Sequence, residues 1–239
     1  MMMRKADNPQ GKEKGFTPLT LEEIHEATEK RIEKVQKEFR DGFELIENSP
    51  ASVTFFGSAR LSENHPSYKT ARNLAHKIVK ELKYSVLTGG GAGIMEAANR
   101  GAFEADGKSL GLNIKLPQEQ KLNNYVTDQA TFHYFFSRKV CLSFSAEAYV
   151  FFPGGFGTLD ELFEILTLVQ TKKIERVPII LVGKQFWKHF DRLIKKMLVN
   201  KKLIDSEDRD LYIITDNLDE VVDVIKEAPI RNGIRFRGN

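Results

Sequence analysis

The sequence predicts an α/β fold in which a doubly wound parallel sheet carries helices on both faces. From Ser52 onward, apolar strand patterns alternate with amphipathic helical patterns, as in chains that build parallel sheets. The predicted strands are continuous apolar runs, which is typical of strands that are buried on both faces. A chain of 239 residues is long enough for one such domain and an appended element.

The expected elements follow one another in regular order. Apolar residues at three- and four-residue steps predict an accessory helix over residues 19–48. The predicted strands are Val53–Phe56, Ser85–Leu87, Ser109–Ile114, Tyr149–Phe152, Ile179–Val182 and Tyr212–Ile214. The predicted helices are Pro66–Leu82, Ile94–Ala105, Ser137–Ser145, Thr158–Thr171, Gln185–Val199 and Leu218–Glu227. We therefore expect a single domain over residues 49–228, a mobile segment at 1–18 and a basic tail at 229–239.

Composition argues against several classes of function. A formal net charge of +3, with acids and bases mixed along the chain, does not favour nucleic acid as a partner. The sequence has no apolar run of membrane-spanning length and its first residues lack a signal-peptide pattern, so we expect no membrane association and a cytoplasmic location. The lone Cys141 excludes a disulfide within the chain, and the five histidines lack metal-ligand spacing, so we expect no metal.

Glycine- or serine-bearing loops follow three of the predicted strands. They are Gly57-Ser58 after the first strand, Gly89–Gly93 after the second and Gly154–Gly157 after the fourth. Glycine lets backbone N–H groups approach a ligand closely. In open parallel sheets, ligands bind beyond the carboxyl ends of the strands, where the strand order reverses. The sequence therefore predicts a binding pocket at this edge.

The run Pro153–Glu161, PGGFGTLDE, joins a predicted strand to a predicted helix. Its glycines and the free N–H groups of the helix start suit a phosphate, and Thr158 can add a hydroxyl. Glu161 follows about one turn later, so we interpret the run as a phosphate cradle with a carboxylate beside it. The spacing of Thr158 and Glu161 also fits a capping box, and both interpretations stay open here. The same spacing occurs at Thr20 with Glu23 and at Asn217 with Glu220.

Two better-known nucleotide motifs do not fit the glycine loops. A dinucleotide G-x-G-x-x-G would need glycine at Ile94 or Glu96, and no G-x-x-x-x-G-K-[ST] occurs. A phosphate site of mononucleotide size remains. Arg138 and Lys139 stand at the start of a predicted helix, where cations are unfavourable unless an anion neutralises them. An arginine there can hold a phosphate or ribose hydroxyls with its planar fork.

Four ordered motifs resemble the Lonely Guy (LOG) family, formerly labelled "possible lysine decarboxylase". They are FFGSAR at 55–60, TGGGAGIM at 88–95, FSRK at 136–139 and the PGGFGTLDE run, and the resemblance covers roughly Ser52 to Ile225. Members are Rossmann-like phosphoribohydrolases that cleave the N-glycosidic bond of nucleoside 5′-monophosphates and are best known for releasing cytokinin bases. A lysine decarboxylase would need a Schiff-base lysine for pyridoxal phosphate, and no lysine here has that context.

The resemblance implies a set of site residues and partners. It implies that Arg138 and Glu161 are catalytic. The residues that it assigns to the substrate and its phosphate are Gly57, Ser58, Gly90, Gly91, Met95, Lys139, Gly154, Gly155, Gly157 and Thr158. It implies an AMP-like 5′-monophosphate as substrate, no cofactor, and a homodimer whose subunits both line the pocket. The apolar helix after PGGFGTLDE independently favours a dimer, since it is apolar around more than one stripe.

We expect Glu161 to stabilise the positive charge on the ribose, because glycosidic cleavage passes through an oxocarbenium-like transition state. Asp160 and Glu96 are weaker candidates for acid–base work. The segment 118–125 departs from the plant members' pattern, so a cytokinin preference is not implied. The aromatic residues Phe132, Tyr134 and Phe135 fit either stacking on a base or an ordinary strand. The alternative to an enzyme is a nucleotide-binding module without catalysis.

Overall fold

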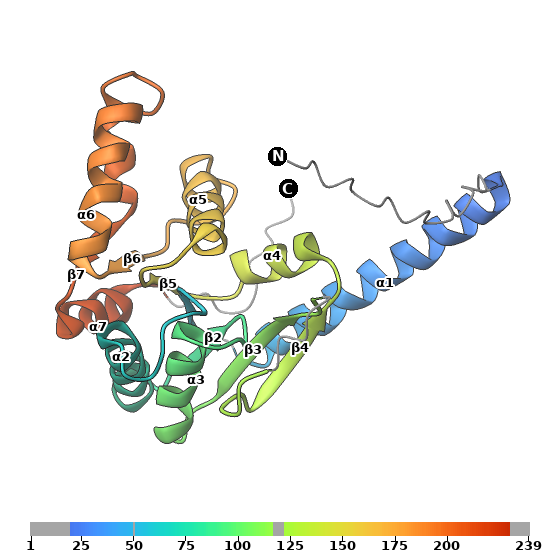
Figure 1. The fold of residues 1–239 in the computed structure, drawn as a ribbon, viewed down its shortest axis with the longest axis horizontal. Coiled ribbons are helices and arrows are strands. Elements are labelled where there is room, and N and C mark those ends of the chain that lie inside the picture. The colour runs from blue at the N-terminus through green and yellow to red at the C-terminus, as the bar shows by residue number, and fades with distance from the viewer. Residues whose placement is uncertain (1–19, 50, 117–121, 230–239) are drawn as a thin grey trace, which may run out of the picture. The chain divides into compact units, whose positions relative to one another are not determined.

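Seven parallel strands form one sheet in the computed structural model, which describes residues 20–49, 51–116 and 122–229. The strand order is β4-β3-β2-β1-β5-β6-β7 (Figure 1), and every neighbouring pair is parallel. The strands are β1 (Ser52–Phe56), β2 (Ser85–Thr88), β3 (Ser109–Ile114), β4 (Asp128–Phe132), β5 (Ala148–Phe151), β6 (Ile179–Val182) and β7 (Ile213–Thr215). The predicted α/β fold with a doubly wound parallel sheet is confirmed.

The order of the strands reverses beside β1. The chain proceeds outward from β1 through β2 and β3 to β4, then returns to the other side of β1 with β5. The loops after β1 and β5 therefore leave neighbouring strands in opposite directions, which opens the crevice where sheets of this type bind ligands.

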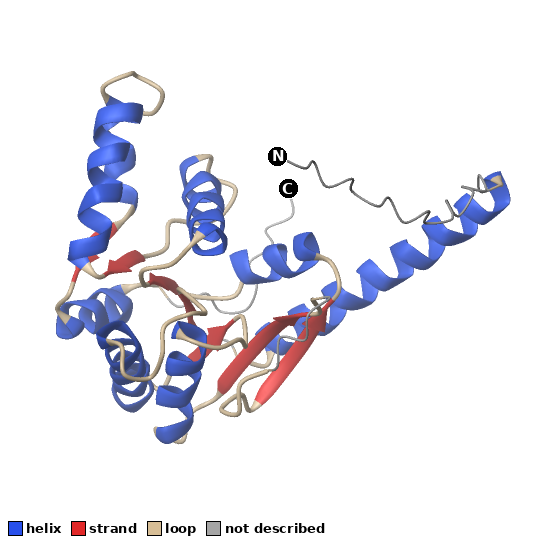
Figure 2. Ribbon diagram, in the orientation of Figure 1, coloured by secondary structure: helices blue, strands red, loops and turns tan. Residues whose placement is uncertain are grey.

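Helices cover both faces of the sheet (Figures 1 and 2). One hydrophobic cluster joins the sheet to α2 (Pro66–Leu82), α3 (Ile94–Glu104) and α7 (Leu218–Glu227). The other joins it to α4 (Phe135–Ser143), α5 (Phe156–Gln170) and α6 (Lys184–Leu193), and includes Ile46 of α1 (Leu21–Glu47). In β1, Val53 and Phe55 belong to the first cluster and Phe56 to the second, so apolar side chains of this strand are buried on both faces of the sheet.

The chain divides into two compact units, 1–34 and Val35–Asn239. In the first unit the described residues after Thr20 are helical and exposed. The second unit contains the sheet and also the last part of α1. The segment 1–18, the arginines of the basic tail and residues 118–121 lie outside the described residues. No helix among the described residues is long and apolar enough to cross a membrane.

Three local features differ from the prediction. The strand β4 was not predicted, because it lies at the sheet edge with Asp128 and Gln129 exposed and so lacks an apolar run. The helix α6 ends at Leu193 and continues as a π-helical stretch, Ile194–Val199. The aromatic run is split: Phe132 is buried at the end of β4, whereas Phe135 begins α4 and is 58% exposed.

Candidate active site

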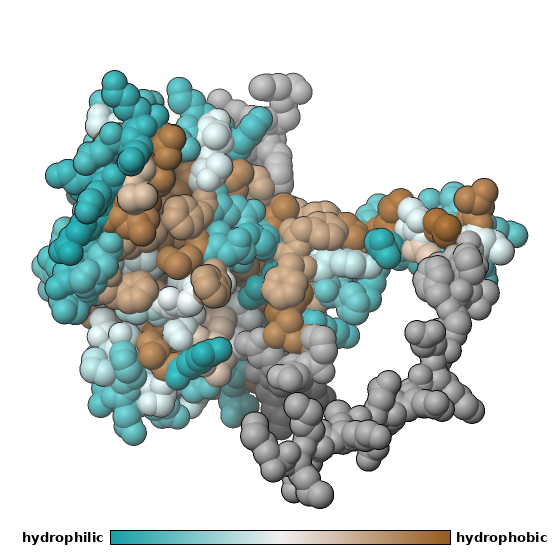
Figure 3. Space-filling model, turned by 45° about the horizontal axis from the view of Figure 1, so that its top comes forward, coloured by the Kyte–Doolittle hydropathy of each residue, from teal (hydrophilic) through white to brown (hydrophobic). Residues whose placement is uncertain are grey.

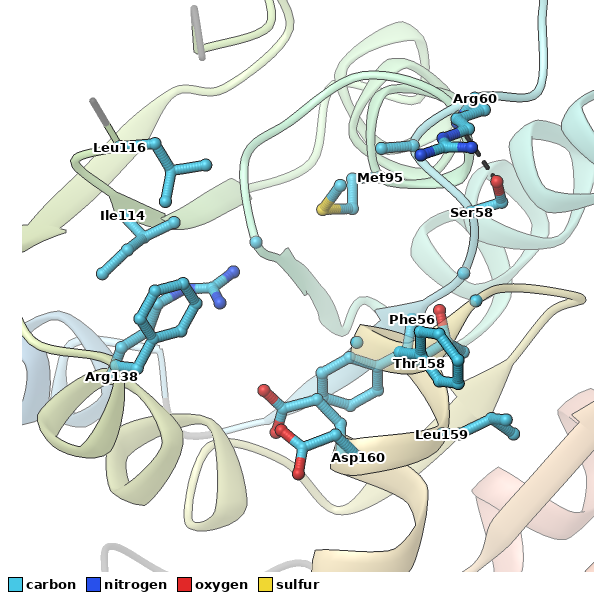
Figure 4. A pocket seen from close by; sticks show the side chains of 18 residues that line it. Phe56, Ser58, Arg60, Met95, Ile114, Leu116, Arg138, Thr158, Leu159 and Asp160 are labelled. Carbon is cyan, nitrogen blue, oxygen red and sulfur yellow. Dashed lines mark hydrogen bonds between the residues drawn. The ribbon is translucent and has the colours of Figure 1, made fainter. Parts of the chain in front are cut away.

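A cavity of about 660 Å³ opens at the carboxyl ends of β1, β2 and β5, at the point where the strand order reverses. Its walls come from the loops after these strands and from α3, α4 and α5 (Figure 4). Eight of the predicted site residues line it: Gly57, Ser58, Met95, Arg138, Gly155, Gly157, Thr158 and Glu161. The cavity therefore lies where the sequence predicted a pocket.

The N-terminus of α5 forms one wall of the cavity. The helix begins at Phe156 after the N-cap Gly155, and the first helical hydrogen bond runs from the Leu159 amide to the Gly155 carbonyl (3.1 Å). The amides of residues 156–158 precede this bond and are the free donors of the helix end. A Cβ at Gly155 or Gly157 would meet no atom of the described residues within 4 Å, so packing against these residues does not require either glycine. Both leave room for an anion to approach the backbone.

The capping-box interpretation of Thr158 is wrong, because Thr158 is the third residue of α5 and not its N-cap. A capping box does form at Thr20, whose amide donates to Glu23 (2.8 Å) while the Glu23 amide donates to the Thr20 hydroxyl (3.2 Å). The Thr158 side chain packs against Gly154 instead. A Cβ at Gly154 would lie 2.1 Å from Thr158 Oγ1, so this glycine is needed for packing and does not line the cavity.

Backbone hydrogen bonds connect the loop after β1 to the loops after β2 and β5. The Ser58 amide donates to the Pro153 carbonyl (3.1 Å), and the Ile94 amide donates to the Ser58 carbonyl (3.0 Å). Gly93 has φ +67°, and a Cβ there would lie 2.3 Å from the Ser58 carbonyl oxygen. Glycine is therefore required at residue 93 by both its backbone conformation and its neighbour.

Two predicted ligand glycines, Gly90 and Gly91, do not line the cavity. The Gly90 amide donates to Thr88 Oγ1 (2.8 Å), and both glycine carbonyls accept from Asn123 Nδ2. Their polar groups thus hold the loop after β2 together. Gly89 is the glycine of this loop that lines the cavity.

Arg138 enters the cavity from α4, on the side opposite Thr158 and Asp160 (Figure 4). Its Nε donates to the Leu112 carbonyl (2.7 Å), which anchors the partly buried guanidinium. A Cβ at Gly89 would lie 2.2 Å from Nη2, so only glycine gives the side chain its room. Burial lowers the pKa of Arg138 and the nearby Glu161 opposes this, but a guanidinium remains charged at any ordinary pH.

Glu161 is 7% exposed and projects from the second turn of α5 to the cavity. Its Oε2 has no hydrogen-bond partner among the described residues, which is unusual for a buried polar atom. Burial raises the pKa of Glu161 to about 7, although Arg138 and Lys139 act to lower it. A carboxyl group that titrates near neutral pH in a cavity suits proton transfer or the stabilisation of a cation.

Lys139 does not line the cavity, although the sequence placed it with the substrate-binding residues. Its Nζ lies 2.7 Å from Asp160 Oδ2 and 2.7 Å from Glu164 Oε2. Asp160 lines the cavity and is largely exposed. Glu96 does not line the cavity either and accepts a hydrogen bond from the Tyr68 hydroxyl (2.9 Å).

Several lining residues were missed by the sequence analysis. Arg60 lies on the rim, and its amide donates to Ser58 Oγ (3.1 Å; Figure 4). The sequence could have indicated Arg60, because it lies three residues after Gly57 and a cation beside a loop at the end of a strand suits an anionic ligand. Ile114 and Leu116 add an apolar wall to which no motif pointed, together with Phe135, which the sequence analysis offered as a ring that could stack on a base. In the described part of the chain, no cluster of His, Cys, Asp and Glu could hold a metal ion.

The fold and the cavity define a Rossmann-like α/β protein with a pocket at the switch point of its sheet. The chain belongs to the LOG family: a family model described as "Possible lysine decarboxylase" matches residues 95–225. The predicted membership of this family is thereby confirmed.

Curated relatives and solved structures are similar to this chain over most of its length. A "Probable cytokinin riboside 5'-monophosphate phosphoribohydrolase LOG4" from Oryza sativa subsp. japonica is 27% identical over 178 residues, covering 73% of this chain and 75% of the relative. LOG5 of Arabidopsis thaliana, a cytokinin riboside 5'-monophosphate phosphoribohydrolase, is 21% identical over 196 residues, covering 80% and 84%. The crystal structure of TM1055 has a TM-score of 0.57 at 25% identity, covering 74% of this chain and 99% of that one. The molybdenum cofactor carrier protein of Chlamydomonas reinhardtii shares the fold, with a TM-score of 0.53 at 21% identity, covering 74% and 97%.

Proposed function

We propose that the protein is a phosphoribohydrolase that cleaves the N-glycosidic bond of a nucleoside 5′-monophosphate to give the free base and ribose 5-phosphate. The observation that carries the proposal is the buried Glu161, whose Oε2 has no hydrogen-bond partner in the described part of the chain, in one cavity with Arg138 and the start of α5. The curated relatives, whose names give this reaction on cytokinin riboside 5′-monophosphates, supply the reaction class.

In this proposal, residues of two loops and Arg138 bind the substrate, and Glu161 acts on the ribose. The 5′-phosphate binds at the start of α5, where Gly155, Gly157 and Thr158 present backbone donors to it, and Ser58 adds a hydroxyl from the loop after β1. Arg138 holds the ribose or phosphate oxygens from the opposite wall. Glu161 lines the same cavity, where its carboxylate stabilises the positive charge that develops on the ribose and orients the attacking water. Water adds to the anomeric carbon, and the base departs with a proton.

The base occupies the apolar side of the cavity in this arrangement. Met95, Leu116 and Phe135 line that side, and the exposed ring of Phe135 is available to stack on a purine. We propose an AMP-like substrate on this basis.

The test is a screen of the purified protein against AMP, GMP, IMP, CMP, UMP and N6-isopentenyl-AMP, with detection of ribose 5-phosphate and free base. Binding of a monophosphate without release of base would instead make the protein a nucleotide-binding module.

The 5′-phosphate is expected to be essential for turnover. Adenosine should be cleaved at least about tenfold less efficiently than AMP, because it loses charge-assisted hydrogen bonds to the start of α5. Release of adenine from both compounds under equal conditions gives kcat/KM for each. Equal efficiency on adenosine and AMP would contradict a phosphate site at Gly155, Gly157 and Thr158.

We also propose that the protein is a homodimer. Figure 3 shows apolar side chains gathered on one face of the molecule. Five large apolar residues of α5, α6 and the π-helical stretch are more than a third exposed: Phe156, Phe163, Phe186, Leu193 and Met197. A two-fold interface is the commonest way to cover such a surface. Light scattering after size exclusion should give a mass well above the 27.3 kDa of one chain, and a mass of one chain at micromolar concentration contradicts the dimer.

A further inference from the structure

The first turns of α4 carry two cations, which calls for a compensating anion. Arg138 and Lys139 are the fourth and fifth residues of this helix. The helix end is itself positive, so cations placed there are unfavourable unless a negative group lies close by. The N-cap residue Tyr134 makes no side-chain capping bond, so nothing within α4 supplies that group at its start.

Asp160 and Glu164 pair with Lys139. A further anion, at the helix start itself, comes from α1, about 95 residues earlier in the chain. Glu38 is 5% exposed, and its carboxylate accepts three hydrogen bonds at the start of α4. The donors are the His133 amide (2.7 Å to Oε1), the Tyr134 amide (3.3 Å to Oε2) and the Ser137 hydroxyl (2.5 Å to Oε2). A buried carboxylate bonded in this way satisfies the amides of the N-cap Tyr134 and of the residue before it, and it offsets the positive charge of the helix end.

Close packing holds this segment of α1 against α4 and β4. Gly42 and Ile46 follow Glu38 at four-residue steps, so all three lie on one face of the helix, and all three are buried. A Cβ at Gly42 would lie 2.7 Å from both Cys141 Sγ of α4 and Phe132 Cζ of β4. The Glu38 carboxylate therefore has a fixed position relative to α4. This part of α1 belongs to the same compact unit as the sheet.

We propose that Glu38 is a positioning residue for Arg138. Arg138 directly follows Ser137, so the turn that Glu38 holds is the turn from which the guanidinium leaves α4. Its other anchor is the bond from Nε to the Leu112 carbonyl (2.7 Å). With both anchors in place, the guanidinium reaches into the cavity beside Gly89. The effect on turnover rests on the proposed function, whereas the effect on the Arg138 side chain does not.

The kinetic test compares Glu38→Gln with Glu44→Gln. Glutamine keeps the shape of Glu38 but removes its charge and turns one acceptor into a donor that faces amide donors. Glu44 is an exposed glutamate of the same helix in the same compact unit and is a matched control. We expect kcat/KM on the best monophosphate to fall roughly 10- to 100-fold in Glu38→Gln, since a small displacement of a positioned group has effects of that size. Glu44→Gln should stay within about twofold of the wild type.

A second background separates positioning from general structural support. If Glu38 acts through Arg138, Glu38→Gln should change kcat/KM by less than about twofold when Arg138 is already lysine. An equal fall in both backgrounds overturns the proposal. Thermal denaturation of each variant identifies loss of folding. If Glu38→Gln does not fold, Ser137→Ala takes its place, because it removes only one of the three donors.

A spectroscopic readout makes the test independent of catalysis. The Nε–H signal of Arg138 in a ¹⁵N–¹H spectrum is assigned by its absence in Arg138→Lys. Because this group is bonded to Leu112, its hydrogen should exchange slowly with water in the wild type and at least about tenfold faster in Glu38→Gln. Unchanged exchange in Glu38→Gln overturns the proposal. If the wild type cleaves no monophosphate, the proposed function fails while this measurement still decides the role of Glu38.

Discussion

Replacing Glu161 by glutamine should lower kcat on the best monophosphate by about 10²- to 10⁴-fold, while the nucleotide still binds. Glutamine fills the same space in the second turn of α5 but cannot carry the negative charge that the developing ribose cation requires. Initial rates of base release and calorimetric titration with the same nucleotide measure the two effects separately. A rate close to that of the wild type would show that Glu161 is a structural residue.

The same variant should be more stable than the wild type at alkaline pH, which excludes misfolding as the cause of lost turnover. Burial raises the pKa of Glu161 from 4.5 to about 7, so the folded state holds this proton more tightly than the unfolded state. The contribution of this proton to wild-type stability is therefore fully present below about pH 4.5, and it is lost as the pH rises through 7. Glutamine does not titrate. When the pH is raised from 4.5 to 8, the free energy of unfolding of Glu161→Gln, measured by urea denaturation, should rise relative to that of the wild type by on the order of 3 kcal/mol. The control Glu44→Gln should show no such relative change.

The sequence predicted the sheet well wherever strands are buried on both faces. The strands β1, β2, β3, β5 and β6 are mostly apolar and almost wholly buried because helices cover both sides. The edge strand β4 has exposed polar residues, Asp128 and Gln129, and its pattern resembles a loop. An edge strand such as β4 forms because it pairs with another strand, here β3, and the spacing of its own apolar residues does not reveal that pairing.

The glycine loops indicated the place of the cavity but not the task of each glycine. Gly154 and Gly155 are adjacent in the sequence, yet a Cβ at the first would collide with Thr158 and a Cβ at the second would meet open space. The start of α5 was placed two residues late, because its N-cap Gly155 has no side chain to mark it, whereas Thr158 looks like a cap. Glu38 was not predicted as part of the site, because only the packing of α1 distinguishes it from the exposed glutamates of the same helix.

Arg138→Lys should lower kcat/KM on the best monophosphate by about 10²-fold, although the positive charge is kept. Lysine offers one point of charge in place of a planar fork, and it loses the Nε–H that bonds to the Leu112 carbonyl. Its ammonium therefore lacks the anchor that aims the guanidinium past Gly89 into the cavity. Because charge is conserved, the loss measures geometry and not electrostatic attraction alone.

The matched control for Arg138→Lys is Arg72→Lys. Arg72 also uses its fork, since Nε and Nη2 both donate to Glu104 at 2.6 and 2.7 Å, but it does not line the cavity. The same substitution there should change kcat/KM by less than about twofold, because an exposed ion pair contributes little even to stability. If the two variants have equal kcat/KM, the fork of Arg138 has no part in binding the substrate. A large loss confined to residue 138 would instead support contact between its guanidinium and the ribose or phosphate oxygens, since only a group at the reacting molecule depends so strongly on its geometry.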